Sequence, residues 1–189
     1  MKKLFIIISL IALSAGITSC GGSSKSKQAL VTLGELDDFF TVKSYSLESD
    51  AEQKGVDNLK NVKGTLTLVV KRNKEEMPLK PSDVDYADFG GEIASSAFYV
   101  FKGDCDAAIK QMLKMEAGKE ETFTLGFVAI DPYDKYNTEE DNKTERQNIF
   151  DALTKSGCLD QITFDIEWKK SAKQVLKALM KMVADDDDD

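Results

Sequence analysis

The chain has 189 residues, a length that suits one domain and is short for two ordinary ones. It contains no histidine, which excludes Ser-His-Asp and Cys-His catalysis and any histidine-ligated metal site. Lysines and arginines total 25 against 33 aspartates and glutamates, a formal net charge of −8. Phosphate binding needs clustered positive charge, so no nucleic-acid partner is expected.

The first twenty residues have the layout of an export signal. Lys2 and Lys3 supply positive charge and precede the apolar run Leu4 to Ile17. A helix of about 14 residues is about 21 Å long, which is short for a bilayer core of about 30 Å. The pattern predicts a signal peptide over residues 1–19. A buried core helix and a short membrane anchor are the alternatives.

The end of this segment, Ile17 to Cys20 (ITSC), resembles the bacterial lipobox, in which an aliphatic residue and two small residues precede an invariant cysteine. The resemblance covers residues 1–20. It implies cleavage before Cys20, a lipid such as palmitate on the Cys20 thiol, and acylation of the new amino end. Each buried CH₂ group of an acyl chain contributes about 0.8 kcal/mol, so several chains would make the membrane a lasting partner.

The residues after Cys20 bear on sorting and on the anchor. Gly21 stands where an aspartate would favour inner-membrane retention, and no acidic export cluster follows the cysteine. The resemblance therefore implies an outer-membrane protein that faces the periplasm. Gly21 to Lys27 is small and polar, and residues 20–29 are predicted to form a lipidated flexible tether.

Residues 30–168 are predicted to form the folded domain. Period-two alternation of apolar residues predicts strands at Val62 to Arg72, Thr122 to Ile130 and Ile162 to Trp168. Weaker patterns cover Phe39 to Leu47 and Ala97 to Phe101, and the segment 30–33 is a candidate edge strand. The residues expected to face the core are Leu66, Leu68, Val70, Phe123, Leu125, Phe127, Ala129, Ile162, Phe164, Ile166 and Trp168.

Two short helices are predicted between the strands. Asp104 is a candidate N-cap for a helix that runs to about Met115, with Gly118 beyond its end. Thr144 to Gln147 has the capping-box pattern, and Gly157 would end the helix that follows.

These elements predict a mainly β fold, an antiparallel immunoglobulin-like β-sandwich with short helical insertions and a C-terminal amphipathic helix. Lys114 to Phe127 resembles the late part of immunoglobulin-like domains in uncharacterised bacterial lipoproteins. The tyrosine corner and the Cys-Trp-Cys spacing of true immunoglobulin domains are not matched. A mixed α+β sheet is the alternative.

With Cys20 assigned to lipid, Cys105 and Cys158 remain, and an even pair in an oxidising compartment suggests one disulfide. Two separate buried thiols are the alternative. Catalysis by either thiol is not expected, because the chain has no CxxC motif and no histidine that would lower a thiol pKa.

Two acidic segments are candidate contact surfaces. Asp83 to Asp88 holds three carboxylates but lacks the spacing of a calcium loop, so we expect a solvated acidic loop and no metal site. A longer loop begins at Asp131 and continues through Asp141. Exposed tyrosines on loops are common recognition elements, and this loop supplies the candidate binding residues Asp131, Tyr133, Asp134 and Tyr136.

The last segment, residues 169–184, is predicted to be an amphipathic helix that precedes an acidic tail, residues 185–189. Its lysines recur every four residues at Lys169, Lys173, Lys177 and Lys181. An apolar stripe lies on another face and consists of Val175, Leu176, Leu179, Met180 and Val183. Three alternatives remain for this helix: packing on the domain, docking to another envelope protein, and lying on a membrane surface.

The sequence therefore predicts a lipid-anchored envelope protein that acts as a non-catalytic binding or interaction module, without a cofactor. Two alternatives have different chemistry. One is a carboxylate-based hydrolase of an envelope glycan, which would use acids such as Asp131 and Asp134. The other is a structural spacer between the membrane and another protein.

Overall fold

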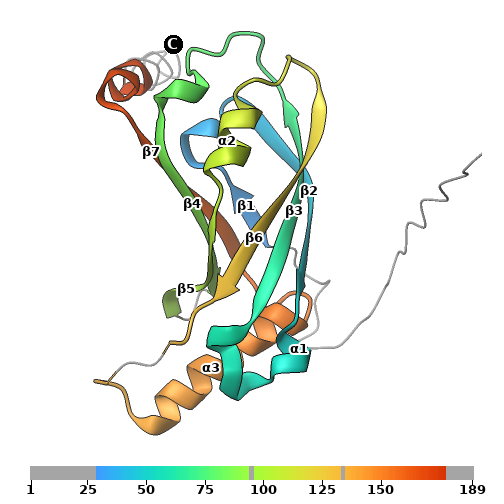
Figure 1. Ribbon diagram of the computed structural model, residues 1–189, viewed down its shortest axis with the longest axis vertical. Helices are drawn as coiled ribbons and strands as arrows, with labels where there is room; N and C mark the ends of the chain where they lie inside the picture. The colour runs from blue at the N-terminus through green and yellow to red at the C-terminus, as the bar shows by residue number, and fades with distance from the viewer. Residues whose placement is uncertain (1–28, 94–95, 133–134, 178–189) are drawn as a thin grey trace, which may run out of the picture.

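The computed structural model describes residues 29–93, 96–132 and 135–177, and this part of the chain is mainly β. The predicted signal peptide, Cys20, the tether up to residue 28 and the acidic tail lie outside the described residues. Seven strands form one mixed sheet that is nearly barrel-shaped (Figure 1). In chain order the strands are β1 (Leu30–Thr32), β2 (Phe40–Ser49), β3 (Lys63–Arg72), β4 (Val84–Ile93), β5 (Ser96–Asp104), β6 (Glu120–Ala129) and β7 (Gln161–Trp168).

The strand order in the sheet is β1-β7-β4-β5-β6-β3-β2. The pair β1–β7 is parallel, and the other neighbouring pairs are antiparallel. The two outer edges approach each other where the Ala29 N–H donates to the Tyr45 hydroxyl of β2 at 2.9 Å. The prediction of a mainly β fold is confirmed. The arrangement differs from the two packed sheets of an immunoglobulin-like sandwich, because all seven strands are hydrogen-bonded into a single curved sheet.

The sheet has two ends that matter for function. We define the entry end as the end of the sheet at which the strands that start with Leu30, Lys63 and Gln161 begin. The far end is the end at which the strands that finish with Arg72 and Trp168 stop. The helices α1 (Ala51–Lys54) and α3 (Glu139–Thr154) and the 3₁₀ segment η2 (Val56–Asn61) lie at the entry end, whereas α2 (Asp106–Met112) lies toward the far end (Figure 1). The short 3₁₀ segments η1 (Gly34–Leu36) and η3 (Pro81–Asp83) lead into β2 and β4.

The interior is filled by the alternate residues that the period-two pattern predicts. Those expected to face the core from β3, β6 and β7 are all buried. The helix α2 adds Ile109 and Met112, both fully buried, to the same core. Every strand predicted from the sequence is present, including the edge strand β1, so the core-facing pattern is confirmed.

A row of phenylalanine rings crosses the interior over β7, β4, β5 and β6. Phe164 stacks on Phe89 with ring centroids 5.3 Å apart, and Phe101 lies 4.5 Å from Phe127. Three of these rings sit over the glycine directly opposite them on a neighbouring strand. The pairs are Phe89 with Gly103, Phe101 with Gly91, and Phe127 with Gly64. A Cβ atom at any of the three glycines would overlap the facing ring, so each glycine supplies the space that its phenylalanine fills.

We expect Gly103→Ala to destabilise the fold by about 1–3 kcal/mol, because the added methyl would overlap the Phe89 ring and lie 2.5 Å from the Gly126 carbonyl oxygen. Gly126→Ala is the matched control: it also lies in a strand, but nothing lies within 4 Å of an added Cβ. Urea denaturation should show a change of no more than about 0.5 kcal/mol for this control. Equal free energies of unfolding for both variants would contradict the pairing.

Strand β4 corrects the prediction for Asp83 to Asp88, which the sequence suggested was a solvated loop. Only Asp83 lies before the strand, in η3. A register shift between Val84 and Tyr86 sets the alternation so that Ala87 and Phe89 are buried in the core. The carboxylates and the Gly90–Gly91 pair hid this strand, because both are unusual in strands.

Helix α3 begins six residues before the predicted cap. Thr138 is the N-cap: its hydroxyl accepts from the Asp141 N–H at 3.1 Å, and its own N–H donates to the Asp141 carboxylate at 3.2 Å. Thr144 lies within the helix, where its hydroxyl donates to the Glu140 carbonyl. The loop after Asp131 is therefore shorter than predicted. The predicted helix from Asp104 is also present, over Asp106–Met112 with Cys105 as its N-cap residue.

The two threonines distinguish the predicted from the observed helix start. Thr138→Ala should lower the free energy of unfolding by about 1 kcal/mol through loss of the cap. Thr144→Ala should change it by less than about 0.5 kcal/mol, since alanine suits a helix interior. The reverse order of effects in thermal or urea denaturation would place the helix start at Thr144.

At the far end, the buried guanidinium of Arg72 holds two loops together. It donates to the carbonyl oxygens of Lys74 at 2.9 Å and Glu75 at 2.6 Å, and also to that of Met115. The loop after β3 and the turn after α2 are thereby fixed to the same strand end.

The final helix is docked on the sheet over its described part, residues 170–177. Ala172 and Leu176 are buried, whereas Val175 is partly exposed. The Lys169 N–H donates to the Asp83 carbonyl at 2.9 Å, and its ammonium group donates to the Ser82 carbonyl at 2.7 Å. This supports the packing alternative for the first two turns. Leu179, Met180, Lys181 and Val183 lie outside the described residues.

Candidate functional site

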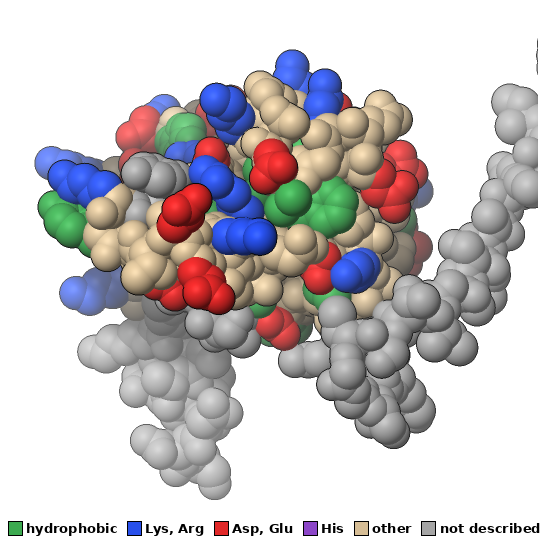
Figure 2. Space-filling view, turned by 90° about the horizontal axis from the view of Figure 1, so that it is seen from below, with side chains coloured by type: hydrophobic (Ala, Val, Ile, Leu, Met, Phe, Trp, Pro, Cys, Tyr) green, Lys and Arg blue, Asp and Glu red, His purple; other side chains and the backbone are tan. Residues whose placement is uncertain are grey.

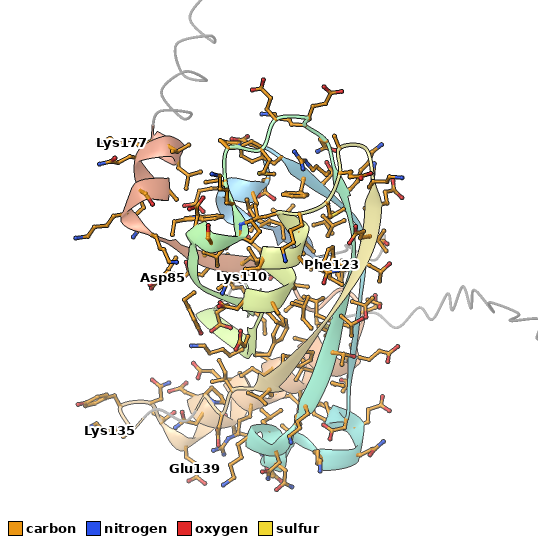
Figure 3. All side chains as sticks on the ribbon, turned by 45° about the horizontal axis from the view of Figure 1, so that its top comes forward. Asp85, Lys110, Phe123, Lys135, Glu139 and Lys177 are labelled. Atoms are coloured by element: carbon orange, nitrogen blue, oxygen red, sulfur yellow. The ribbon has the colours of Figure 1, made fainter. Side chains whose placement is uncertain are left out.

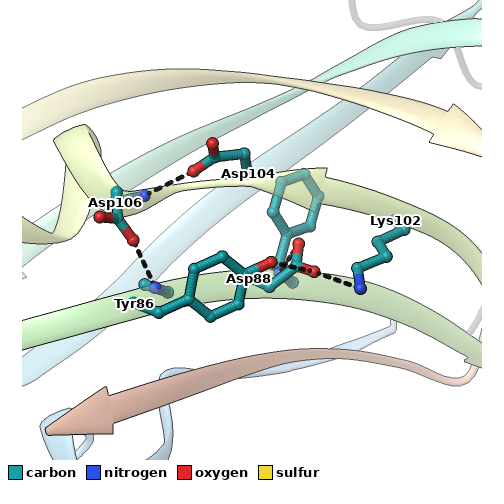
Figure 4. A network of polar contacts seen from close by, with 7 residues as sticks. Tyr86, Asp88, Lys102, Asp104 and Asp106 are labelled. Carbon is teal, nitrogen blue, oxygen red and sulfur yellow. Dashed lines mark hydrogen bonds and ion pairs between the residues drawn. The ribbon is translucent and has the colours of Figure 1, made fainter.

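The most organised polar cluster lies on the outer face of β4 and is centred on Asp88. Asp88 is buried to 93%, with 7% of its surface exposed. Its carboxylate accepts hydrogen bonds from the Phe89 N–H at 2.9 Å and from the Tyr86 hydroxyl at 3.0 Å, and it pairs with the Lys102 ammonium group at 3.1 Å (Figure 4). The hydrogen bond to Asp88 raises the pKa of Tyr86, with smaller contributions from burial and from the Asp88 charge.

Asp106 joins this cluster to helix α2. Its carboxylate accepts from the Ala87 N–H, and its own N–H donates to Asp104 at 3.2 Å (Figure 4). The Asp106 carboxylate also accepts from the Lys110 ammonium group at 2.8 Å. The bond from Lys110 is the largest effect and lowers the pKa of Asp106; burial opposes it, and the bond from the Ala87 N–H and the Lys110 charge lower the pKa further. Asp106 therefore fixes the start of α2 to strand β4.

The register places three carboxylates in one row across the sheet. Asp88 is directly opposite Asp165 on β7 and Asp104 on β5. A small cavity of about 120 Å³ lies beside this row and is lined by Asp88, Phe89, Lys102, Ile130, Thr163 and Asp165. Like charges directly opposite each other destabilise a sheet, so Lys102 is placed where it offsets this repulsion.

The cluster does not have the composition of a metal centre. Among residues 29–93, 96–132 and 135–177, no group of three or more acidic or cysteine side chains could hold a metal ion. Asp88 and Asp106 each accept hydrogen bonds from a backbone N–H and from side chains of the same domain. The arrangement therefore holds β4, β5 and α2 together beside a small recess.

Two residues of the predicted tyrosine loop, Asp131 and Tyr136, have different surroundings in the structure. Asp131 accepts from Arg146 of α3 through both oxygens, at 3.0 and 3.4 Å. Tyr136 is 84% exposed, and the Lys135 ammonium group lies 4.8 Å from its ring centroid. Tyr133 and Asp134 lie outside the described residues. Asp131 is thus engaged with the helix, whereas Tyr136 stands at the surface of the entry end.

The cysteines expected to pair are not bonded to each other in the structure. The Cys105 N–H donates to the Ala87 carbonyl near the far end of β4, whereas Cys158 precedes β7, whose residue Gln161 faces Glu92. Five residues of strand separate these two levels of β4, or about 17 Å. A disulfide needs Cα atoms within about 7 Å, so this fold corrects the predicted bond.

Cys105 is also unsuited to thiol chemistry. Burial raises its pKa well above the usual range, and the neighbouring carboxylates of Asp88, Asp104 and Asp106 raise it further. The thiolate form that attacks substrates or binds metals is therefore disfavoured at this position.

The network around Asp88 was not predicted from the sequence, because the carboxylates of Asp83 to Asp88 indicated a loop. The available signal was weak: Tyr86 and Asp88, like Lys102 and Asp104, are two residues apart and so share a face of a strand. This spacing predicts a polar cluster only when β4 is known to be a strand and its register with β5 is known.

No protein-family model, no curated protein and no solved structure matches this chain. In the part of the chain that the structure describes, no helix has both the length and the apolar character that spanning a bilayer requires.

Asp106→Asn should make the free energy of unfolding depend less on pH in the acidic range. Because the pKa of Asp106 is lower in the folded chain than in the unfolded one, the ionised form stabilises the fold above about pH 4, and this contribution is lost as the pH falls through the folded pKa. The variant should lose about 1 kcal/mol at pH 7 and show a smaller further loss between about pH 5 and pH 2 than the parent.

The control for this experiment is Asp57→Asn, at an exposed position whose carboxylate makes no hydrogen bond or ion pair with the described residues. Urea denaturation at a series of pH values should give the parent's pH dependence for this control. The same slope for Asp106→Asn would show that the bonds to Lys110 and Ala87 contribute nothing.

Proposed function

We propose that this chain is a lipid-anchored protein of the cell envelope that works as a non-catalytic binding module. The observation that carries the proposal is the lipobox-like sequence ending at Cys20, placed behind a charged and apolar leader. Lipid on Cys20 would make the membrane the protein's permanent partner. The proposed location is the outer membrane, on its periplasmic side.

The structure supports this proposal through the place where the chain enters the folded body. Ala29 is buried, and its N–H donates to Tyr45; the Leu30 N–H donates to the Asp160 carbonyl at 2.9 Å. Ala29 is nine positions after Cys20 in the sequence, and an extended chain of nine residue steps spans at most about 32 Å. A lipid on Cys20 would therefore keep the entry end close to the bilayer.

The surface of the entry end has a mixed character that suits a position near a membrane without insertion. Figure 2, which views this end, shows lysines and arginines interspersed with acidic side chains around a small apolar patch. The far end would then point away from the bilayer and carry the final helix. Figure 3 shows this separation, with Lys177 at one end and Lys135 and Glu139 at the other.

The polar contacts favour binding over hydrolysis. A glycosidase needs two carboxyl groups that flank a cleft. Asp131, one of the two acids considered for that role, is held by Arg146, and Asp88 is held by Tyr86 and Lys102. These contacts show that both acids bind side chains of the same domain. We therefore favour a binding role over hydrolysis.

Metabolic labelling with radioactive palmitate in a bacterial host tests the anchor. The parent should incorporate label and partition with membranes, and Cys20→Ser should do neither, because it lacks the acceptor thiol. Cys158→Ser is the matched control and should behave like the parent. Equal labelling and fractionation of parent and Cys20→Ser would contradict the proposal.

A further inference from the structure

A groove lies between the final helix and strand β7 at the far end of the sheet. Its volume is about 460 Å³, within the range of about 300–1,000 Å³ typical of small-molecule sites. Trp168 and Leu176 contribute apolar surface to it. Glu35 of η1 lines it as well, and its carboxylate lies 3.4 Å from the Trp168 indole nitrogen, which fixes the ring at the groove.

The two walls of the groove carry opposite charge. Asp165 and Glu167 line it from β7, and being two residues apart they share the outer face of the strand, about 7 Å from each other. Lys173 and Lys177 line it from the helix, and being four residues apart they share one helix face, about 6 Å from each other. The groove is thus lined by acidic side chains from the strand and basic side chains from the helix, and Glu35 adds a third carboxylate.

These opposite charges do not neutralise each other. In the described part of the chain, Asp165, Glu167, Lys173 and Lys177 make no ion pair or hydrogen bond through their charged groups. A groove lined by unpaired groups of both charges is complementary to a ligand that carries both charges. A simple anion would be repelled by the β7 carboxylates, and a simple cation by the lysines.

We propose that this groove binds a zwitterion that carries an ammonium group and a carboxylate, as in a free amino acid or a short peptide with unblocked ends. The ammonium group lies at Asp165 and Glu167, and the carboxylate lies at Lys173 and Lys177. An apolar side chain between them packs on Trp168 and Leu176. This inference rests on the proposed binding role, but it does not depend on lipid at Cys20.

Isothermal titration calorimetry of the full chain in detergent tests the proposal with one tripeptide, Ala-Phe-Ala, in three forms. The unblocked peptide should bind, and N-acetylation or C-amidation should each weaken binding about five- to tenfold by removing one charge. Free phenylalanine is the second probe. Binding of the amino acid but not the tripeptide, or the reverse, identifies which source of the shared chemistry the groove accepts.

Two variants test which groove residues bind the carboxylate of the peptide and which bind its ammonium group. Lys173→Gln should weaken binding of the unblocked peptide and reduce the difference between its free and amidated forms, because Lys177 remains. Glu167→Gln should reduce the difference between the free and acetylated forms, because Asp165 remains. The matched controls, Lys43→Gln and Glu48→Gln, change exposed residues of β2 and should leave all affinities unchanged.

The proposal would be overturned by absence of heat with both probes at millimolar concentration, by equal affinity for the blocked and unblocked peptides, or by equal effects of groove and control variants. Binding that occurs only after removal of residues 178–189 would also overturn it, because it would assign the groove to the chain's own end. Loss of palmitate labelling in Cys20→Ser is read in a separate experiment, so failure of the groove and failure of the anchor are distinguishable.

Discussion

Phenylalanine rings that occupy the space left by glycines on neighbouring strands hold this sheet in its shape. Phe89, Phe101 and Phe127 each lie over the glycine directly opposite, and Phe164 continues the row by stacking on Phe89. Such a fit works in only one register, because a slip of one residue would turn each ring to the opposite face of the sheet. Gly103 has no room for a side chain, since an added Cβ would meet both the Phe89 ring and the Gly126 carbonyl oxygen. The curvature of the sheet and the separation of its two ends follow from this packing.

The same register decides what the outer face presents. Phe89 points into the core, so the preceding residue Asp88 points outward and lies between Asp104 and Asp165. The network with Tyr86 and Lys102, and the bond from Asp106 to the backbone of β4, are therefore consequences of the core packing. The groove at the far end has the same origin, because alternation along β7 buries Ile166 and Trp168 and turns Asp165 and Glu167 outward.

The parts of this fold that depend on local periodicity could be predicted from the sequence, and the parts that depend on register could not. Leu66 and Phe123 were assignable to the core because alternation is a local property. The amphipathic helix was likewise predicted from its apolar stripe, but its packing on the domain was only one of three alternatives, and Val175 of that stripe is exposed. Strand β4 was hidden by its carboxylates and glycines, whose roles appear only when Phe101 and Gly103 of β5 lie beside them. The predicted disulfide failed for the same reason, since the levels of Cys105 and Cys158 on the sheet follow from pairings between distant segments. The N-cap at Thr138 was missed because Thr144 offered a similar pattern six residues later, and in the structure its hydroxyl bonds within the helix.

We propose that a lipid on Cys20 would hold the entry end near the bilayer and leave the far end, with its charged groove, directed away. The most direct measurement is energy transfer from a single dye on the lipid-modified protein to acceptor lipids in vesicles, with Cys105 and Cys158 replaced by serine. A dye at Lys135→Cys marks the entry end, and a dye at Lys177→Cys marks the final helix. If the entry end lies near the bilayer, energy transfer to the acceptor lipids should be stronger from position 135 than from position 177. Equal transfer from the two positions, or stronger transfer from position 177, would contradict it.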